Sequence, residues 1–191
     1  VLNRLTGDPF VSGKIVAGVA AALFSWASFV WLAILTSPRQ ALAAQALLSL
    51  NVYFIESALF LGTDLPWAAL QVLSLAVLGL GARRDRLGWT FLAGALNGLA
   101  YLYRYTALVA VPVGIAYLLL FRPLRGGWRR NAVAALGYGL AFLLLASPQI
   151  ALSQIEMGTP FFTAQAKNVW FGIYGEGDWR ENWRRVRSDL T

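Results

Sequence analysis

A series of apolar blocks, each about as long as a bilayer is thick, constrains the fold of this chain more than any other feature. The blocks cover residues 13–35, 41–61, 65–82, 87–103, 107–121 and 131–152. Of the 191 residues, 58% are hydrophobic and 13% charged, whereas soluble domains are nearer half apolar and a quarter charged. A soluble core of this size cannot hold so many long apolar segments. The sequence therefore predicts an all-α, polytopic transmembrane helical bundle of about six spans.

The fourth and fifth blocks are predicted to form one short helical hairpin. As a single helix, residues 87–121 would extend about 52 Å, against a hydrocarbon core of roughly 30 Å. Basic clusters lie at both ends, so an even number of crossings is needed to keep both clusters on one side. Arg104, Tyr105 and Thr106 form the polar point near the middle, and we expect the chain to turn there.

The net charge of +7 lies in three short connections between the blocks. Their charged residues are Arg39; Arg83, Arg84, Asp85 and Arg86; and Arg122, Arg125, Arg129 and Arg130. Short loops rich in Lys and Arg stay on the cytoplasmic side, so this charge records orientation and indicates no nucleic-acid partner. We expect a multi-pass protein of a plasma or inner membrane, with its N-terminal end and C-terminal tail extracytoplasmic. The predicted domains are a transmembrane region over 1–152 and an aromatic, charged tail over 153–191.

Two residue types that often carry chemistry, His and Cys, are absent from the sequence. Their absence excludes Cys/His zinc sites, thiol nucleophiles and Ser-His-Asp triads within this chain. The sequence also has no Walker or GxGxxG motif and no cluster of acidic metal ligands. The sequence thus identifies no cofactor, and it does not decide whether the protein requires a divalent metal ion.

Two carboxylates on the predicted extracytoplasmic side are candidate site residues. Asp64 lies in the turn GTDLP at 62–66, where it caps the third span, faces an outward-opening cavity, or does both. Glu56 lies within an apolar block, so it either faces a protein interior or lies close enough to the interface to reach water. The sequence leaves both alternatives open for each residue.

Arg104 is the candidate with the most distinctive surroundings, since Tyr101, Tyr103 and Tyr105 lie close to it in the sequence. An Arg side chain suits bidentate binding of a phosphate, and aromatic neighbours limit its hydration. The alternative is an interfacial belt of aromatic residues with a snorkelling Arg.

Two further patterns have a structural interpretation. Gly94 and Gly98 have the spacing that is typical of closely packed membrane helices. The aromatic and acidic residues of the tail are typical of a segment lying at the outer interface, although a sugar-binding surface would combine the same residue types.

Five short motifs occur in a distinctive order along the chain. They are LTGDPF at 5–10, PRQALAA at 38–44, GTDLP at 62–66, GLAYLYRYT at 98–106 and MGTPFF at 157–162. In this order the motifs resemble the transmembrane core of the GT-C glycosyltransferases that use polyprenyl-phosphate sugars. Within these enzymes, the chain is most similar to the dolichyl-phosphate-mannose protein mannosyltransferase-like and RgtA-like group. The resemblance covers nearly the whole chain.

The resemblance implies a membrane-embedded glycosyltransferase that transfers a sugar from a polyprenyl-phosphate carrier to an acceptor on the extracytoplasmic face. It implies that Asp64 lines an outward cavity near the donor and that Arg104 contacts the carrier phosphate. Glu56 and Tyr105 are further substrate-binding candidates. The catalytic carboxylate of such enzymes lies in the first outside loop, and nothing in this sequence matches that loop. We therefore expect that loop upstream of Val1, so that the chain is a fragment that is inactive alone.

Two other function classes remain in view. In a transporter or flippase segment, Glu56, Asp64 and Arg104 would line a path, and paired repeats with broken helices at matching positions would be expected. In a non-catalytic membrane scaffold, the same residues would only cap helices and snorkel. The sequence identifies neither the sugar nor the acceptor.

Overall fold

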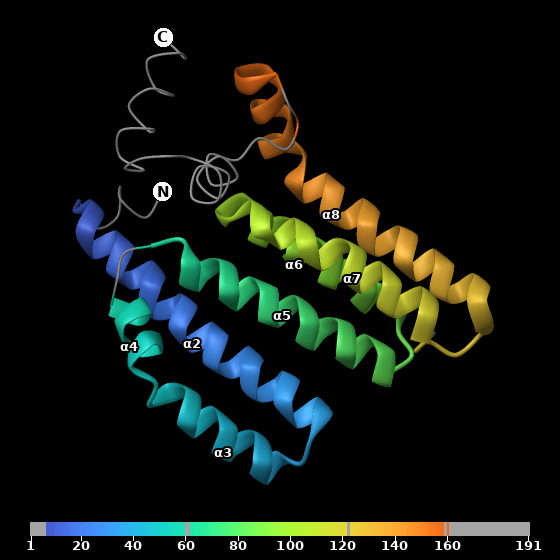
Figure 1. Cartoon of the computed structure of the whole chain (residues 1–191), viewed down its shortest axis with the longest axis horizontal. Coiled ribbons are helices and arrows are strands. Elements are labelled where there is room, and N and C mark those ends of the chain that lie inside the picture. The colour runs from blue at the N-terminus through green and yellow to red at the C-terminus, as the bar shows by residue number, and fades with distance from the viewer. Residues whose placement is uncertain (1–6, 60–61, 122, 159, 161–191) are drawn as a thin grey trace, which may run out of the picture. The chain divides into compact units, whose positions relative to one another are not determined.

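The structure, a computed structural model, describes residues 7–59, 62–121, 123–158 and 160. All regular elements among these residues are helical, which confirms the predicted all-α fold. The helices are α2 (Pro9–Leu35), α3 (Pro38–Ser49), α4 (Val52–Leu59), α5 (Asp64–Arg83), α6 (Leu87–Tyr103), η1 (Tyr105–Val109), α7 (Ala110–Ala116), η2 (Tyr117–Phe121) and α8 (Gly127–Met157) (Figure 1). The chain divides into two compact units, Val1–Ser147 and Pro148–Thr191, at a proline inside α8. The predicted domain boundary at 152 stays a prediction, and most of the predicted tail lies outside the described residues.

Three helices are long and apolar enough to cross a membrane: Phe10–Leu35, Asp64–Arg83 and Gly127–Ile155. They correspond to the first, third and last predicted spans. The two legs of the predicted hairpin are shorter, since α6 and the stretch Tyr105–Phe121 have 17 residues each. By length and composition, the described residues therefore hold three spans, or four with one bent pair, where the sequence predicted about six.

The second predicted span, 41–61, corresponds to the bent pair α3 and α4, so this stretch is not one continuous helix. Together α3 and α4 are long and apolar enough for a single span, but the two helices meet at 65°. The side chain of Asn51 accepts hydrogen bonds from the backbone N–H groups of Tyr53, at 2.9 Å, and Phe54, at 3.3 Å. An amide oxygen in this position caps the start of a new helix, which is why α4 does not continue α3.

The predicted hairpin turn at Arg104 is confirmed. Arg104 has an extended backbone, with φ −150° and ψ 128°, between the end of α6 and the start of η1. After the turn the chain runs back along α6, so that Leu118 of η2 and Ala93 of α6 lie in one hydrophobic cluster with Tyr138 of α8. The hairpin and the first part of α8 thus share a core.

Glycines allow α6 to approach α8 closely, as the GxxxG spacing predicted. A Cβ atom on Gly98 would lie 2.7 Å from the carbonyl oxygen of Phe142, and one on Gly94 would overlap the backbone of Tyr138. Only a residue without a side chain fits at such a contact.

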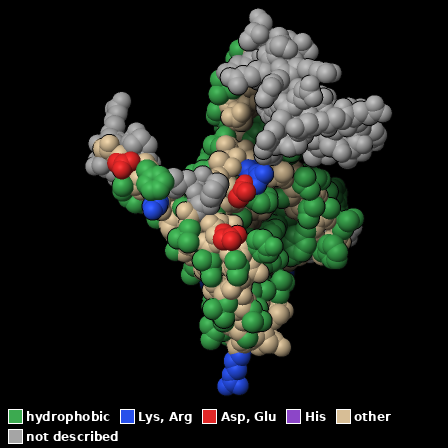
Figure 2. All heavy atoms as spheres, turned by 60° about the vertical axis from the view of Figure 1, so that its left-hand side comes forward, with side chains coloured by type: hydrophobic (Ala, Val, Ile, Leu, Met, Phe, Trp, Pro, Cys, Tyr) green, Lys and Arg blue, Asp and Glu red, His purple; other side chains and the backbone are tan. Residues whose placement is uncertain are grey.

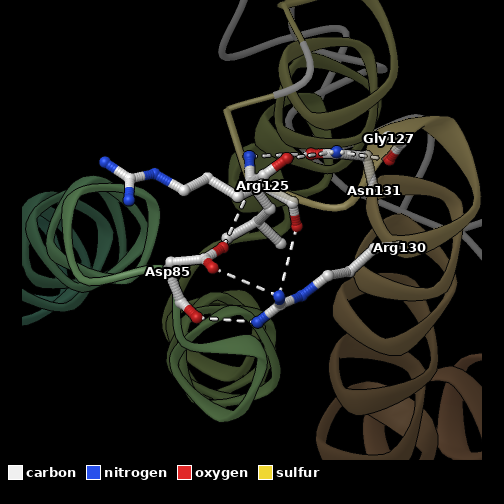
Figure 3. A network of polar contacts seen from close by, with 6 residues as sticks. Asp85, Arg125, Gly127, Arg130 and Asn131 are labelled. Atoms are coloured by element: carbon white, nitrogen blue, oxygen red, sulfur yellow. Dashed lines mark hydrogen bonds and ion pairs between the residues drawn. The ribbon is translucent and has the colours of Figure 1, made fainter.

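Polar contacts join the predicted cytoplasmic connections, at what we call the Asp85 end of the bundle (Figure 3). The Asp85 carboxylate accepts a hydrogen bond from the backbone N–H of Arg125, at 2.9 Å, and pairs with the guanidinium of Arg130, at 3.1 Å. The side chain of Asn131 is fully buried. Its amide oxygen accepts a hydrogen bond from the N–H of Leu124, at 3.0 Å, and its amide nitrogen donates to the carbonyls of Leu124 and Gly127, at 2.9 Å each. The connection after α5 is thereby fastened to the connection before α8.

A third predicted cytoplasmic connection meets the same end, because the Arg83 guanidinium donates to the carbonyl of Ile34 at the end of α2. The prediction that the basic connections lie together is therefore consistent with the packing of this unit. Away from these connections, the surface shown in Figure 2 is largely hydrophobic, with few charged side chains.

Candidate functional site

Arg104 lies at the opposite end of α5 and α6, which we call the Arg104 end. The two helices run antiparallel, and a hydrogen bond of 2.7 Å from the Ser74 hydroxyl to the carbonyl of Ala93 joins their middles. This register places the first turn of α5 beside the last turn of α6. The extended backbone at Arg104 then directs its side chain to α5.

The structure brings two of the predicted site residues together at this end. The Arg104 guanidinium forms an ion pair with the carboxylate of Asp64, 40 residues earlier in the chain. The Arg104 side chain is 25% exposed and that of Asp64 is 68% exposed. Because the pair is open to solvent on the Asp64 side, its contribution to stability is small, of the order of 1 kcal/mol or less.

Asp64 does not cap α5, so that interpretation is wrong. Asp64 is itself the first residue of the helix, and Thr63 occupies the capping position without a side-chain hydrogen bond to the helix. The Asp64 carboxylate still lies in the first turn, where a negative charge is favourable next to the helix dipole. Its partner is Arg104.

A cavity of about 640 Å³ lies between the end of α4 and the start of α5. Its lining residues are Glu56, Ser57, Leu59, Gly62, Thr63, Asp64 and Leu65. Glu56 is exposed, and its carboxylate and that of Asp64 belong to one cavity. Both predicted acidic residues therefore line the same cavity, and Arg104 contacts one of them, Asp64.

A second, apolar groove of about 250 Å³ runs between α2 and α5 and reaches Tyr103, the residue before Arg104. Its walls include Val19 and Leu23 of α2 and Ala69 and Leu70 of α5. The lining of the groove thus includes the residue that precedes Arg104 in the chain.

Tyr105, the fourth predicted site residue, begins η1 and is half-buried. Among the contacts of the described residues, none joins Tyr105 to Arg104, Asp64 or Glu56. Its role in substrate binding stays a prediction.

Sequence reasoning missed Trp67, which packs against Arg104. The guanidinium carbon of Arg104 lies 5.7 Å from the centre of the Trp67 ring, within cation–π range. Trp67 follows Asp64 by three residues, so both face the same side of α5. That spacing could have linked the two residues, but it gives no indication of their contact with Arg104.

Over the part of the chain that the structure describes, no group of three or more His, Cys, Asp or Glu side chains could hold a metal ion. The acidic residues of the predicted tail, Glu176, Asp178 and Glu181, lie outside that part. The metal dependence of the protein stays an open prediction.

No curated protein and no solved structure matches this chain. The family model that matches it is described as dolichyl-phosphate-mannose-protein mannosyltransferase, and the match covers residues 1–151. These residues include Glu56, Asp64, Arg104 and the helices that hold them. The resemblance drawn from the order of motifs is thereby confirmed, and the chain belongs to the dolichyl-phosphate-mannose-protein mannosyltransferase family of membrane glycosyltransferases.

Proposed function

We propose that this chain forms part of a GT-C enzyme that transfers a sugar from a polyprenyl-phosphate carrier to an acceptor on the extracytoplasmic face. The family gives the class of reaction. The observation that carries the proposal is the meeting of three features at the Arg104 end: a half-buried guanidinium, an apolar groove and a cavity with two carboxylates.

The chemistry of the donor matches these features one by one. A polyprenyl-phosphate sugar has a long apolar chain, one phosphate and a polyhydroxylated ring. The groove that ends at Tyr103 suits the apolar chain, and the neighbouring Arg104 suits the phosphate. The carboxylates of Glu56 and Asp64 are acceptors for sugar hydroxyl groups.

The ion pair with Asp64 supports the assignment of Arg104. A guanidinium that is only 25% exposed needs a counter-charge when no anion is bound, and Asp64 supplies it. Because an exposed pair of this kind is weak, a phosphate can replace the carboxylate at small cost.

The base that deprotonates the acceptor hydroxyl is not assigned to a residue of this chain. By the family resemblance, it belongs to an outside loop that no motif of this sequence matches, and we propose that the chain alone does not catalyse transfer. The same proposal places the Arg104 end on the extracytoplasmic side. The meeting of the basic connections at the Asp85 end supports this orientation.

The transporter alternative gains one observation, the 65° bend between α3 and α4. Within the described residues this is the one bent pair, whereas an inverted-repeat transporter has broken helices in corresponding positions of two halves. The family match also favours the transferase.

The test is the substitution Arg104→Ala in the complete protein, with transfer measured in membranes from a radiolabelled polyprenyl-phosphate sugar. We expect transfer to fall by about a hundredfold or more, as for loss of a donor to a developing negative charge. The matched control is Arg39→Ala, since Arg39 is exposed and belongs to the basic connections. Equal membrane insertion of both variants is checked by protease protection. Normal transfer by the Arg104 variant would show that Arg104 does not bind the phosphate.

A further inference from the structure

Several buried polar atoms at the Arg104 end have no hydrogen-bond partner. They are Trp67 Nε1, Gln71 Oε1, Arg104 Nε and Thr106 Oγ1. A buried donor or acceptor without a partner costs free energy, so native proteins pair nearly all of them with protein, water or ligand. In a membrane protein the cost is greater, because lipid offers no replacement partner. Gln45 and Asn97 also have buried side-chain atoms without a partner, so the four residues at this end point to a polar ligand only together with the Arg104–Asp64 ion pair and the Arg104–Trp67 contact.

The four residues come from two adjoining segments. Trp67 and Gln71 are four residues apart on α5 and so lie on one face of that helix. Arg104 contacts the Trp67 ring, and Thr106 follows Arg104 by two residues, in η1. The unpaired atoms thus belong to the first half of α5 and to the turn after α6, and the contact between Arg104 and Trp67 joins these two segments.

Asp64 pairs with only part of the Arg104 guanidinium. Its carboxylate binds Nη1 of Arg104, whereas Nε of the same guanidinium has no partner. The indole N–H of Trp67, the Nε–H of Arg104 and the hydroxyl of Thr106 are all hydrogen-bond donors. A ligand with several acceptor oxygens and a negative charge would satisfy these three donors, one of which is cationic. The fourth unpaired atom, Gln71 Oε1, is an acceptor and has no part in this proposal.

A phosphate group meets this requirement, because all its unesterified oxygens accept hydrogen bonds. We propose that Trp67 and Thr106 donate hydrogen bonds to the same phosphate that Arg104 binds, and so complete the phosphate site of the carrier. The inference rests on the proposed function, since it takes Arg104 as the phosphate ligand. Trp67 has a second role, because its ring supports the guanidinium.

The test uses isosteric substitutions that remove only the donor atoms. Trp67→Phe keeps an aromatic ring under Arg104, and Thr106→Val keeps the shape of the side chain. The matched controls are Trp128→Phe and Thr36→Val, at exposed residues near the start of α8 and the end of α2. Binding to the purified chain in detergent is measured by thermophoresis, with farnesyl phosphate as the lipid probe, inorganic phosphate as the soluble probe and farnesol as the uncharged probe.

We expect each substitution at Trp67 or Thr106 to weaken binding of farnesyl phosphate about tenfold. Farnesol binding should not change, and both control variants should bind like the original chain. Thr106→Ser, which restores the hydroxyl, should bind as tightly as the original chain. Equal thermal unfolding of the variants in detergent excludes a general loss of structure. If inorganic phosphate binds with the same dependence on both residues, the site recognises free phosphate as well as the lipid form.

The outcomes separate this inference from the proposed function. If Arg104→Ala loses affinity for farnesyl phosphate while Trp67→Phe and Thr106→Val keep the affinity of the original chain, the inference is overturned. The unpaired atoms then bind water or another group. If Arg104→Ala keeps the affinity of the original chain, the proposed role of Arg104 is overturned instead. Loss of affinity in the Trp67 and Thr106 variants alone would overturn the inference as well, because it takes Arg104 as the ligand of the same phosphate.

Discussion

Gly94 offers the sharpest test of how α6 packs on α8. Replacement by Ala would place a Cβ atom 2.8 Å from the carbonyl carbon of Tyr138 and 2.9 Å from its Cα, whereas ordinary Cβ contacts begin near 3.4 Å. Both neighbours are backbone atoms and cannot rotate away, so the two helices must separate by more than half an ångström. Overpacking of this kind costs about 1–3 kcal/mol.

A second effect acts in the opposite direction. Replacing a helical glycine by alanine stabilises the helix by roughly 0.5–1 kcal/mol, because alanine loses less backbone entropy. The expected net change for Gly94→Ala is therefore a destabilisation of up to about 2.5 kcal/mol. Gly88 is the matched control, since it lies on the same helix and a Cβ there would meet nothing within 4 Å. Gly88→Ala should therefore leave stability unchanged or raise it.

The assay is unfolding of the purified chain in mixed micelles with increasing fraction of dodecyl sulfate, followed by circular dichroism. The midpoint should move to lower dodecyl sulfate for Gly94→Ala and stay or rise for Gly88→Ala. Equal midpoints for the two variants would refute the close approach of the α6 and α8 backbones.

Three further predictions concern the two ends of the bundle. Asp85→Ala should lower the free energy of unfolding by about 1–2 kcal/mol, because it removes the carboxylate that binds the Arg130 guanidinium and the backbone N–H of Arg125, and thermal unfolding in detergent checks this. Asn131→Ala should cost about 1–3 kcal/mol in the same assay, since it leaves the N–H of Leu124 buried without a partner. Glu56→Gln should lower sugar transfer by the complete protein about tenfold without changing the unfolding temperature, because Glu56 is exposed and lines the cavity. Unchanged transfer would remove Glu56 from the site.

Hydropathy and charge predicted much of the fold because they depend on local sequence. Apolar block length located α2, α5 and α8, and the polar point at Arg104 located the turn of the hairpin. The same pattern failed at Asn51, because an average over an apolar block does not register one side chain that caps a new helix. Hydropathy measures how apolar a segment is, and it does not show where a helix ends and the next one starts in another direction.

The candidate site was only partly predictable, for a different physical reason. Asp64 and Arg104 were each identified from their residue type in a turn, but their ion pair depends on the antiparallel register of α5 and α6. Trp67 lay in an apolar block and had no polar signal of its own. Its contact with Arg104 arises from packing between helices, so it became visible only in three dimensions.

The two ends of α5 and α6 use polar residues in opposite ways, and the contrast indicates where the chemistry lies. At the Asp85 end the charged and amide groups are paired with each other and with the backbone, as in the contacts of Asp85 and Asn131. At the Arg104 end the polar atoms are only partly paired, beside a cavity and a groove. Paired polar groups stabilise a fold, whereas unpaired ones cost free energy and persist where a ligand can bind them. Substitutions at the first end should therefore change stability with little effect on donor affinity, and those at the second should change affinity with little effect on stability.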